Sequence, residues 1–538
     1  MAKAQAKSAD ATGADKFLVL PILVLILAQM GTSGDNGALS LAATALTNDL
    51  GASVGDIQLA NMVYSLMAGA FMIAGGMMGT IIGWKKNFRV GALLCAAGEV
   101  VLAISMNMAM FTWCGRTLVG FGASFMIPSV LGLVPKIYHG KNRLLAFGCI
   151  GAASGLSALL PLVLGIVMQV AGFRVTFAVL AVYFLGVFAL SFKLPAIVQT
   201  DEKLKFDGIG VALAAVGLFM FLVGISRISV WGLIEPFPGA PSFLGISPAL
   251  PMAVAGLVIL VIMIKVEKGV EAKNGFALLP QSFLKTPQVL AGLAASAITF
   301  FFMGVQSILM GPYLQLVAGW SPVMVGVTSI VVGAPTFAFS MGIPKLAPNA
   351  NPRHVIQIGY VVMAAALVVM AFSVTLDGAS TLGIMAGCVL AGSGAGIVSS
   401  HANNVVALAV NERDAAQSGG IQTTMRNVGQ ALGVAALGAV LLFGITGSVT
   451  SGAAADKAIS PEVSQSVSQM SITLTGDEAF EKSLSGIDMT GEEKDELVKI
   501  NAQARYDSTR LAYFVGAVII LLGLLTTPAI KKFSKTEE

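Results

Sequence analysis

The sequence predicts an all-α integral membrane protein, and two observations lead to this prediction: its composition and the lengths of its apolar runs. Of its 538 residues, 56% are hydrophobic and only 11% are charged, and the mean hydropathy is +0.84. A soluble chain of this length needs a far more charged surface. Apolar runs of about 20 residues, enough for a helix to cross a bilayer, also recur along the whole chain.

The apolar runs follow one another in close succession and set the order of the expected elements. Residues 1–16 are polar and are expected to form a disordered cytoplasmic tail. The run after them lacks a small-residue cleavage site, so we interpret it as the first span and not as a signal peptide. By length we expect about 14 spans, near residues 17–46, 57–83, 88–107, 109–135, 145–170, 174–193, 207–228, 248–266, 288–317, 322–344, 354–374, 381–410, 417–446 and 510–530.

Short basic loops indicate the orientation in the membrane. The stretches "WKKNFR", "KIYHGKNR" and "KVEKGVEAK" all fall on one side when the spans alternate. The positive-inside rule assigns that side to the cytoplasm. We therefore expect a multi-pass protein of the plasma (inner) membrane with both termini, including the tail 531–538, in the cytoplasm. The net charge of +4 is too small to suggest a nucleic-acid partner.

One long polar segment, residues 447–509, precedes the last span and is expected to be an extracellular loop. Its stretch "TGEEKDELVKINAQAR" begins as a capping box, because Thr490 stands three residues before Glu493. This predicts a short amphipathic helix that leads into the last span. Two interpretations of the loop remain open. It is either a solvated cap without a role in recognition, or an acidic cap that concentrates cationic solutes at the outer mouth.

Several motifs resemble the major facilitator superfamily, specifically its fourteen-span drug:proton antiporter branch. The loop "GGMMGTIIGWKKNFRVG" is similar to the family pattern G-x-L-x-D-R-x-G-R-K, and "RTLVGFGASFMIPS" to R-x-x-x-G-x-G-A-A. The stretch "LLPLVLG" keeps part of G-P-x-x-G-G, with leucine in place of two glycines. Thr80 replaces the family's Asp, so the usual ion pair of the inner gate is expected to be missing. The gate and motif residues are Gly76, Gly79, Gly83, Lys85, Gly120, Gly122, Pro128, Pro161 and Gly165.

The resemblance implies a fold and a function. The fold has two six-helix bundles, at 17–193 and 288–530, joined by two inserted transmembrane helices within 207–266. The substrate path would run between the bundles by alternating access. The implied function is proton-coupled export of hydrophobic or cationic drugs by a monomer that uses the proton gradient and no cofactor. The alternative is a proton-coupled or facilitated transporter of an anionic metabolite, held by Arg116 and Arg426.

An enzyme is not favoured by any motif in the sequence. H-E-x-x-H, a G-x-S-x-G elbow and a P-loop are all missing. The four cysteines lie in apolar runs at spacings that match neither a metal site nor a disulfide framework. We therefore expect a protein that is not an enzyme, holds no metal and has protons, a small-molecule substrate and the lipid bilayer as its partners.

Ionisable residues inside apolar runs mark the candidate coupling site, because desolvating a charge in lipid is costly. Asp35 is the first candidate for proton coupling, and its alternative is a capping residue at the outer end of a helix. Glu99 is the second candidate and is equally consistent with a structural hydrogen bond. Arg116 resembles the family residue that assists proton movement near the acid of the first span.

Polar residues in the second half of the chain are candidates for the substrate cavity. "SSHANN" forms a polar island in an expected span, and a lone buried histidine there is more often satisfied by a neighbour than functional. The walls are expected to be Met, Phe and Leu, which suit apolar cations. The cavity candidates are Gln306, Gln315, His401, Asn403, Asn404, Gln422 and Arg426.

Overall fold

The computed structural model is almost entirely helical. It describes residues 17–52, 54–157, 159–195, 207–237, 240–274, 277–376, 378–410, 412–470, 472 and 474–531. The predicted tails 1–16 and 531–538 lie outside this part of the chain, apart from Lys531. In the described residues, twelve helices are long and apolar enough to cross a membrane, two fewer than the expected 14. The protein is therefore a multi-pass membrane protein.

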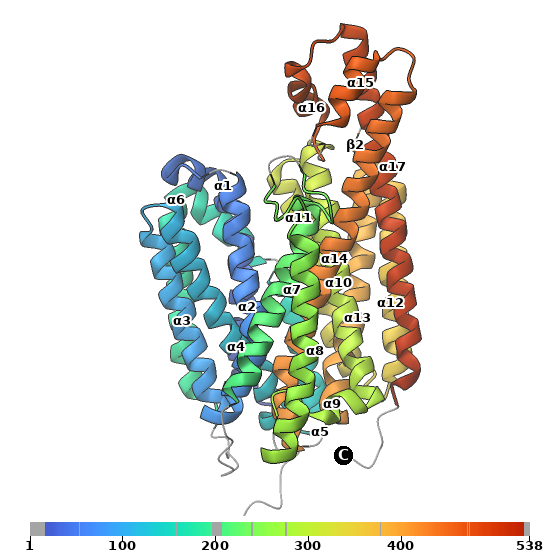
Figure 1. Ribbon diagram of the computed structural model, residues 1–538. Helices are drawn as coiled ribbons and strands as arrows, with labels where there is room; N and C mark the ends of the chain where they lie inside the picture. The colour runs from blue at the N-terminus through green and yellow to red at the C-terminus, as the bar shows by residue number, and fades with distance from the viewer. Residues whose placement is uncertain are drawn as a thin grey trace, which may run out of the picture.

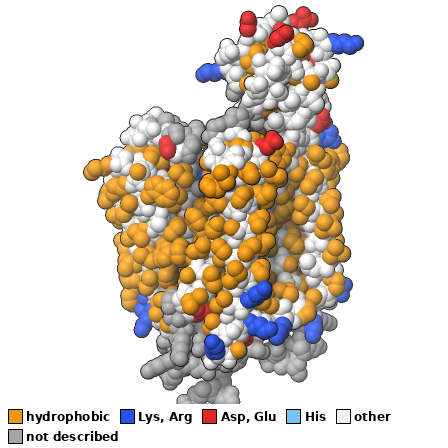
Figure 2. All heavy atoms as spheres, viewed as in Figure 1, with side chains coloured by type: hydrophobic (Ala, Val, Ile, Leu, Met, Phe, Trp, Pro, Cys, Tyr) orange, Lys and Arg blue, Asp and Glu red, His pale blue; other side chains and the backbone are white. Residues whose placement is uncertain are grey.

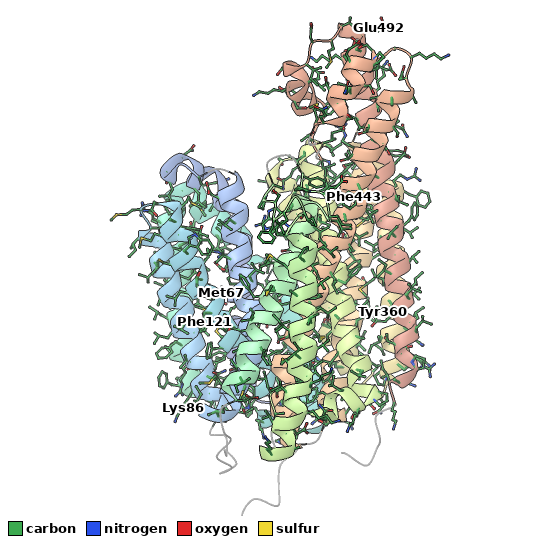
Figure 3. The ribbon with its side chains drawn as sticks, viewed as in Figure 1. Met67, Lys86, Phe121, Tyr360, Phe443 and Glu492 are labelled. Atoms are coloured by element: carbon green, nitrogen blue, oxygen red, sulfur yellow. The ribbon has the colours of Figure 1, made fainter. Side chains whose placement is uncertain are left out.

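The molecule has two polar ends separated by a hydrophobic belt. Figure 2 shows the belt running across both bundles, with Lys and Arg gathered at one end and a charged projection at the other. Lys86 lies at the first end and Glu492 at the tip of the second (Figure 3). We call them the basic end and the capped end. This separation of charge follows the cost of placing charged groups in hydrocarbon.

The first bundle contains the helices of the N-terminal part of the chain (Figure 1). Its core is a continuous cluster of buried apolar side chains, with Phe88, Phe111 and Phe177 among those without exposed surface. A π-helical turn, η1, leads directly into α4. The elements are α1 Val19–Leu50, α2 Val54–Ile82, α3 Trp84–Ile104, η1 Met110–Arg116, α4 Thr117–Ile137, α5 Gly140–Leu156, α6 Leu159–Leu190 and η2 Ser191–Lys193.

The structure divides the expected span 145–170 between two helices, α5 and α6. The chain then turns back just after this span, at Gly172. α5 ends at Leu156 and α6 begins at Leu159, with Pro161 in the first turn, where a missing N–H costs least. α6 is divided at Gly172, whose φ of 77° and ψ of 178° are not helical. The sulfur of Met168 lies 3.8 Å from Oγ1 of Thr176, although eight residues of straight helix span about 12 Å. The chain therefore reverses its direction at Gly172.

The second bundle contains the helices after residue 280 and has its own buried core. β1 and β2 form a two-stranded antiparallel hairpin between α12 and α13. The elements are α9 Gln281–Lys285, α10 Pro287–Leu316, α11 Pro322–Leu346, α12 Pro352–Ser373, β1 Val374–Thr375, β2 Gly378–Ala379, α13 Thr381–Ala409, α14 Glu412–Ala455, α15 Pro461–Ser468, α16 Asp477–Ser483, η3 Leu484–Gly486, α17 Gly491–Leu522 and η4 Gly523–Ala529.

Two inserted helices, α7 Gly208–Trp231 and α8 Ala249–Asn274, connect the bundles. Buried side chains of α7 and α8 pack against α2 of the first bundle, and Ile225 and Ala253 pack against Ala435 of α14. At the basic end, a carboxylate oxygen of the fully buried Glu267 accepts a hydrogen bond from the backbone N–H of Leu278 at 2.5 Å. The chain that leaves α8 is thereby held against that helix.

The cap at the capped end grows out of two long helices, α14 and α17 (Figure 1). α14 has 44 residues, about 66 Å, so it extends well beyond a bilayer core of about 30 Å. The predicted capping box of Thr490 and Glu493 is confirmed. The helix that it starts is not a separate short helix, because α17 continues unbroken into the last membrane segment. The buried Arg505 ties α17 to Asp477 and to the carbonyl of Thr475.

Close contacts between the two bundles lie toward the basic end. A Cβ added to Gly76 of α2 would lie 3.0 Å from Cα of Gly420 in α14, and one added to Gly148 of α5 would lie 2.5 Å from the carbonyl oxygen of Ser340 in α11. Only glycine permits such an approach of two backbones without displacement. The bundles are therefore packed backbone to backbone near this end.

Candidate functional site

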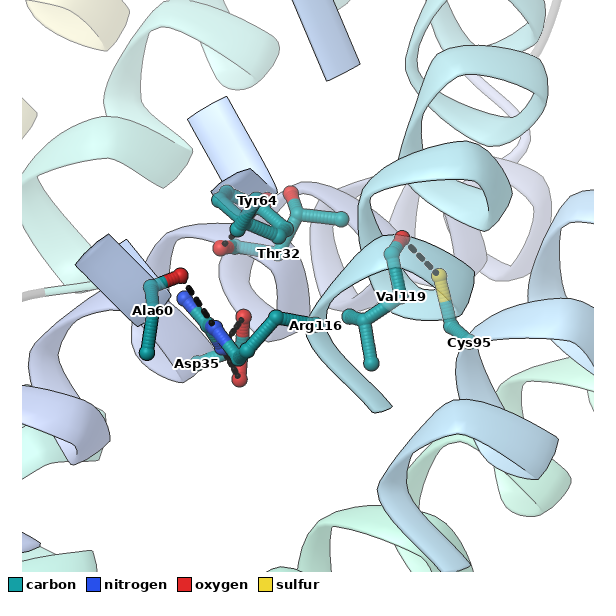
Figure 4. A network of polar contacts seen from close by, with 7 residues as sticks. All are labelled: Thr32, Asp35, Ala60, Tyr64, Cys95, Arg116 and Val119. Carbon is teal, nitrogen blue, oxygen red and sulfur yellow. Dashed lines mark hydrogen bonds and ion pairs between the residues drawn. The ribbon is translucent and has the colours of Figure 1, made fainter. Parts of the chain in front are cut away.

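The predicted acid of the first span, Asp35, forms a buried ion pair with Arg116. Nη1 of Arg116 donates to Oδ1 and Oδ2 of Asp35 at 2.7 and 2.8 Å, and neither side chain is exposed. Nε of Arg116 donates to the carbonyl oxygen of Ala60 in α2 at 3.3 Å. Figure 4 shows these contacts. The structure thus joins two residues that the sequence separates by 81 positions, and it excludes a helix-end role for Asp35, which lies inside α1.

An aromatic ring covers the ion pair. The guanidinium of Arg116 lies 4.6 Å from the centroid of the Tyr64 ring, which is within the range of a cation–π contact. The Tyr64 hydroxyl donates to the carbonyl oxygen of Thr32 at 3.2 Å, one turn before Asp35 (Figure 4). Tyr64 therefore ties α2 to α1 beside the charges. Sequence reasoning missed it, because a single tyrosine in an apolar run gives no signal of its own.

The second predicted acid, Glu99 of α3, lies beside this ion pair. Its side chain is fully buried, and it interacts electrostatically with both Asp35 and Arg116. Two carboxyl groups and one guanidinium from α1, α3 and η1 thus share a buried site, which we call the acidic cluster: Asp35, Glu99 and Arg116.

Small residues bring the helices of the acidic cluster together. A Cβ at Gly98 would lie 2.7 Å from the backbone N of Val119, and one at Gly122 would lie 2.6 Å from the backbone N of Cys95. A Cβ at Gly120 would lie 2.7 Å from the carbonyl oxygen of Tyr64. The motif glycines Gly120 and Gly122 therefore pack α4 against α2 and α3, and this packing places Arg116 next to Glu99.

The motif residues near the basic end hold helix ends together. Gly83 has a φ of 91° and separates α2 from α3, and the Gly79 backbone faces the Trp84 ring. Nζ of Lys85 donates to the carbonyl oxygen of Leu194 at 2.7 Å and to that of Pro195 at 3.1 Å. Lys85 thus caps the end of the first bundle.

The remaining motif positions lie along the same part of the molecule. At Gly419, an added Cβ would lie 2.7 Å from the carbonyl oxygen of Pro128, so Pro128 of α4 lies at the contact with α14. Thr80, in the place of the family's Asp, donates to the carbonyl of Met77 in its own helix. Gly165 lies half-buried in α6, and the side chain of Pro161 lies outside the described part of the structure.

Asn87 is a polar residue of this region that the sequence did not indicate. Its fully buried amide nitrogen donates to the carbonyl oxygens of Gly75 and Phe125 and to Oγ of Ser129, at 2.9, 3.0 and 2.9 Å. These partners belong to α2 and α4, whereas Asn87 belongs to α3. One side chain therefore fixes three helices next to the contact between the bundles.

The second bundle contains a different polar cluster, which we call the amide cluster: Arg426, Asn403 and Gln422. Nη2 of Arg426 in α14 donates to Oδ1 of Asn403 in α13 at 2.6 Å. The guanidinium lies 5.2 Å from the centroid of the Phe300 ring in α10. Gln422, one turn before Arg426, is fully buried. Three helices of the second bundle thus converge on one guanidinium.

The other cavity candidates lie around or away from the amide cluster. His401 is buried, with Nδ1 2.8 Å from Oγ of Ser400, and Asn404 is 4% exposed. Gln306 is half-buried in α10, whereas Gln315 is exposed near the capped end of that helix. The structure therefore gathers Asn403, Gln422 and Arg426 but leaves Gln315 outside.

The fold and these two clusters define a class of protein. Membrane-length helices arranged in two bundles, each with charged residues buried in its interior, are typical of secondary transporters. The chain belongs to the Major Facilitator Superfamily, whose family model matches residues 25–434. The expectation of this superfamily is confirmed.

Relatives of known name are similar over most of their length. The chain is 28% identical to the probable actinorhodin transporter of Streptomyces coelicolor, over 77% of this chain and 70% of that protein. It is 26% identical to the tetracenomycin C resistance and export protein of Streptomyces glaucescens, over 78% and 75%. The crystal structure of the human organic anion transporter MFSD10 (TETRAN) has the same fold, with a TM-score of 0.58 at 12% identity, over 95% of this chain and 98% of that one.

Proposed function

We propose that the protein exports hydrophobic or cationic drug-like molecules in exchange for protons, by alternating access between the two bundles. The observation that carries the proposal is the acidic cluster, in which two buried carboxylates share one guanidinium. Relatives named for the export of tetracenomycin C and for resistance to puromycin support the class of substrate. In this proposal the protein lies in the plasma membrane with its basic end toward the cytoplasm, and a monomer is sufficient.

We further propose that the chain crosses the membrane fourteen times. The twelve apolar helices leave aside α1, whose apolar stretch Val19–Asp35 is short. They also count α6 once, although the chain reverses at Gly172. α5 together with the part of α6 before Gly172 would supply one further crossing, and α1 the other. An even number of crossings would leave both termini on the cytoplasmic side.

Charge balance connects the acidic cluster with proton exchange. Arg116 neutralises one carboxylate, so a second ionised carboxylate would leave a net negative charge in a buried site, which is costly. A proton on the Asp35–Glu99 pair removes this charge, and a cationic group of a substrate or movement of Arg116 would replace it. We therefore assign coupling to the pair, with Asp35 as the residue that Arg116 holds in place.

The backbone contacts near the basic end relate the structure to one state of the proposed cycle. Where Gly76 meets Gly420, the path between the bundles is closed toward the proposed cytoplasmic side. Substrate from the cytoplasm would enter only after these contacts separate, while protons reach the acidic cluster from the capped side. Proton binding in one state and release in the other then drives export.

The test is transport in proteoliposomes with Asp35→Asn and Glu99→Gln. For a proton-coupled exporter, Asp35→Asn reduces efflux driven by a pH gradient to the level of empty liposomes but preserves exchange of labelled for unlabelled substrate at equal pH. Glu267→Gln is the matched control, because Glu267 is also a fully buried carboxylate but lies near the end of α8. Full gradient-driven efflux by both Asp35→Asn and Glu99→Gln would refute proton coupling through this cluster.

In the alternative function, Arg116 and Arg426 would both bind an anionic metabolite. The contacts favour such a role only for Arg426. Nη1 of Arg116 donates to both carboxylate oxygens of Asp35, so the charge of this guanidinium is already balanced by a carboxylate. Arg426 donates to an amide oxygen instead.

A further inference from the structure

Arg426 is buried without a carboxylate partner in the described residues. It is 8% exposed, and the other two buried arginines of the described chain, Arg116 and Arg505, are 0% and 2% exposed. Arg116 pairs with Asp35 and Arg505 with Asp477. A buried charge is normally compensated by an opposite charge, because its desolvation is not repaid by a neutral partner alone. Arg426 therefore lacks the compensation that the molecule provides elsewhere.

Unused hydrogen-bond donors surround the charge. Within the described part of the chain, Nε of Arg426 and both polar atoms of the Gln422 amide, Nε2 and Oε1, have no hydrogen-bond partner. The two residues are four positions apart on α14, so their side chains share one face of the helix. Buried donors in native proteins are almost always satisfied, by protein, water or ligand. Two donors and one positive charge on the same face fit an acceptor that carries negative charge.

An aromatic surface adjoins these donors. The Phe300 ring lies 5.2 Å from the Arg426 guanidinium and is half-buried, so part of it remains accessible. A guanidinium suits a carboxylate or phenolate because of its planar arrangement of donors. A ring next to it suits an aromatic body attached to that acid.

We propose that the amide cluster is an anion subsite that binds the acidic group of an aromatic substrate. Arg426 and Gln422 donate to the carboxylate or phenolate, Asn403 orients the guanidinium, and Phe300 contacts the ring system. This inference rests on the proposed export of drug-like molecules, but it names hydrophobic aromatic compounds that carry an acidic group as the substrates, in place of cationic ones. The first bundle handles the proton, and the second bundle recognises the substrate's negative charge.

The test compares a matched pair of probes, anthraquinone-2-carboxylate and its neutral carboxamide. Binding to the purified full-length protein is measured by titration calorimetry without a pH gradient. The wild type is expected to prefer the carboxylate by about 10- to 100-fold, the range that loss of a hydrogen bond to a charged group represents. Arg426→Gln is expected to abolish this preference by weakening carboxylate binding, while carboxamide binding stays within about twofold.

Two further variants separate recognition from folding. Arg426→Lys keeps the charge and should retain part of the preference, because it loses only the planar donors. Arg510→Gln is the matched control, since Arg510 is a half-buried arginine of α17 that contacts Tyr506, and it should keep the full preference. Thermal unfolding of each variant shows whether it is folded. If Arg426→Gln is not folded, the probe preference of Arg426→Lys is compared with that of the wild type instead.

Equal affinity of the wild type for both probes would overturn the proposal, as would an unchanged preference in Arg426→Gln. Because the readout needs no proton gradient, it is independent of coupling. If Asp35→Asn and Glu99→Gln keep gradient-driven efflux but Arg426→Gln loses the preference, the coupling assignment fails and the subsite stands. If the preference is missing while Asp35→Asn abolishes gradient-driven efflux, the subsite fails and the coupling assignment stands.

Discussion

The two bundles bury an arginine each in their membrane part, and the surroundings of these arginines differ. In the first bundle, Arg116 binds both oxygens of Asp35, with Glu99 beside the pair. In the second, Arg426 contacts the neutral Asn403. The same side chain thus takes part in a site with two carboxyl groups and in one where its contact is an amide. This difference is the basis of the proposed division of work, in which protons and substrate acids bind at separate places.

The largest expected effect comes from breaking the ion pair of the first bundle. Arg116→Gln leaves Asp35 buried without its partner, and such a change typically costs about 3–5 kcal/mol. The double variant Asp35→Asn/Arg116→Gln should recover much of that loss, because neither charge remains. Thermal unfolding in detergent measures both. A double variant as unstable as Arg116→Gln would show that the pair is not the cause.

A second effect concerns the contact that joins the two bundles. Gly76→Val places a side chain where an added Cβ lies 3.0 Å from Cα of Gly420, and overpacking of this kind typically costs about 1–3 kcal/mol. The bundles should separate near the basic end, so Cys149 of α5, 8% exposed, should react faster with a polar thiol reagent, as followed by mass spectrometry.

The matched control for this contact is Gly186→Val in α6, where an added Cβ meets nothing within 4 Å. It should leave the reaction rate of Cys149 unchanged. An equal acceleration by both variants would mean that the contact between Gly76 and Gly420 does not hold the bundles together.

The cap contains a carboxylate, that of Glu493, whose protonation is expected to affect only the second bundle. Glu493 projects beyond the membrane part of α17, and its carboxylate accepts hydrogen bonds from the backbone N–H of Thr490, the Thr490 hydroxyl and the backbone N–H of Ser460, at 2.8, 2.9 and 2.9 Å. The bond from the Thr490 backbone contributes most to lowering the pKa of Glu493 from 4.5 to about 2. The ionised form therefore stabilises the cap fully above pH 4.5, and this contribution is lost as the pH falls toward 2.

Hydrogen exchange of the first turn of α17 measures this loss. Exchange there should accelerate on acidification from pH 5 to pH 2, relative to the intrinsic rate, while the acceleration is absent from Glu493→Gln. Exchange in α4 of the first bundle serves as the internal reference. If Glu493→Gln shows the same acid response as the wild type, another group is responsible for the titration.

The smallest effect is expected at an exposed ion pair of the cap. Lys494 and Glu481 are 2.8 Å apart, with side chains 40% and 44% exposed. Lys494→Gln should change the free energy of unfolding by less than about 0.5 kcal/mol, because water already solvates both charges. Comparison with Arg116→Gln shows how much burial adds to an ion pair. A loss comparable to that of Arg116→Gln would contradict this interpretation.

Features that depend on nearby residues were predictable from the sequence. Apolar runs indicated the helices α7, α8 and α10 to α13, because the length that crosses a bilayer is fixed. The capping box of Thr490 and Glu493 was predictable because both partners lie within one turn. The break at Leu156 was less accessible, since it occurs inside an apolar stretch that hydropathy does not divide. The reversal at Gly172, by contrast, falls between the expected spans 145–170 and 174–193.

By itself, the sequence determined that this is a helical membrane protein and which polar residues its spans carry, because hydropathy and the cost of a buried charge are properties of single residues and short runs. Only the tertiary structure decided which of these residues meet. Asp35 and Arg116 lie 81 positions apart, and the close packing at Gly98, Gly120 and Gly122 brings them together with Glu99. Packing also left Arg426 with an amide in place of a carboxylate. Partner choice depends on contacts between distant helices, which no local pattern encodes.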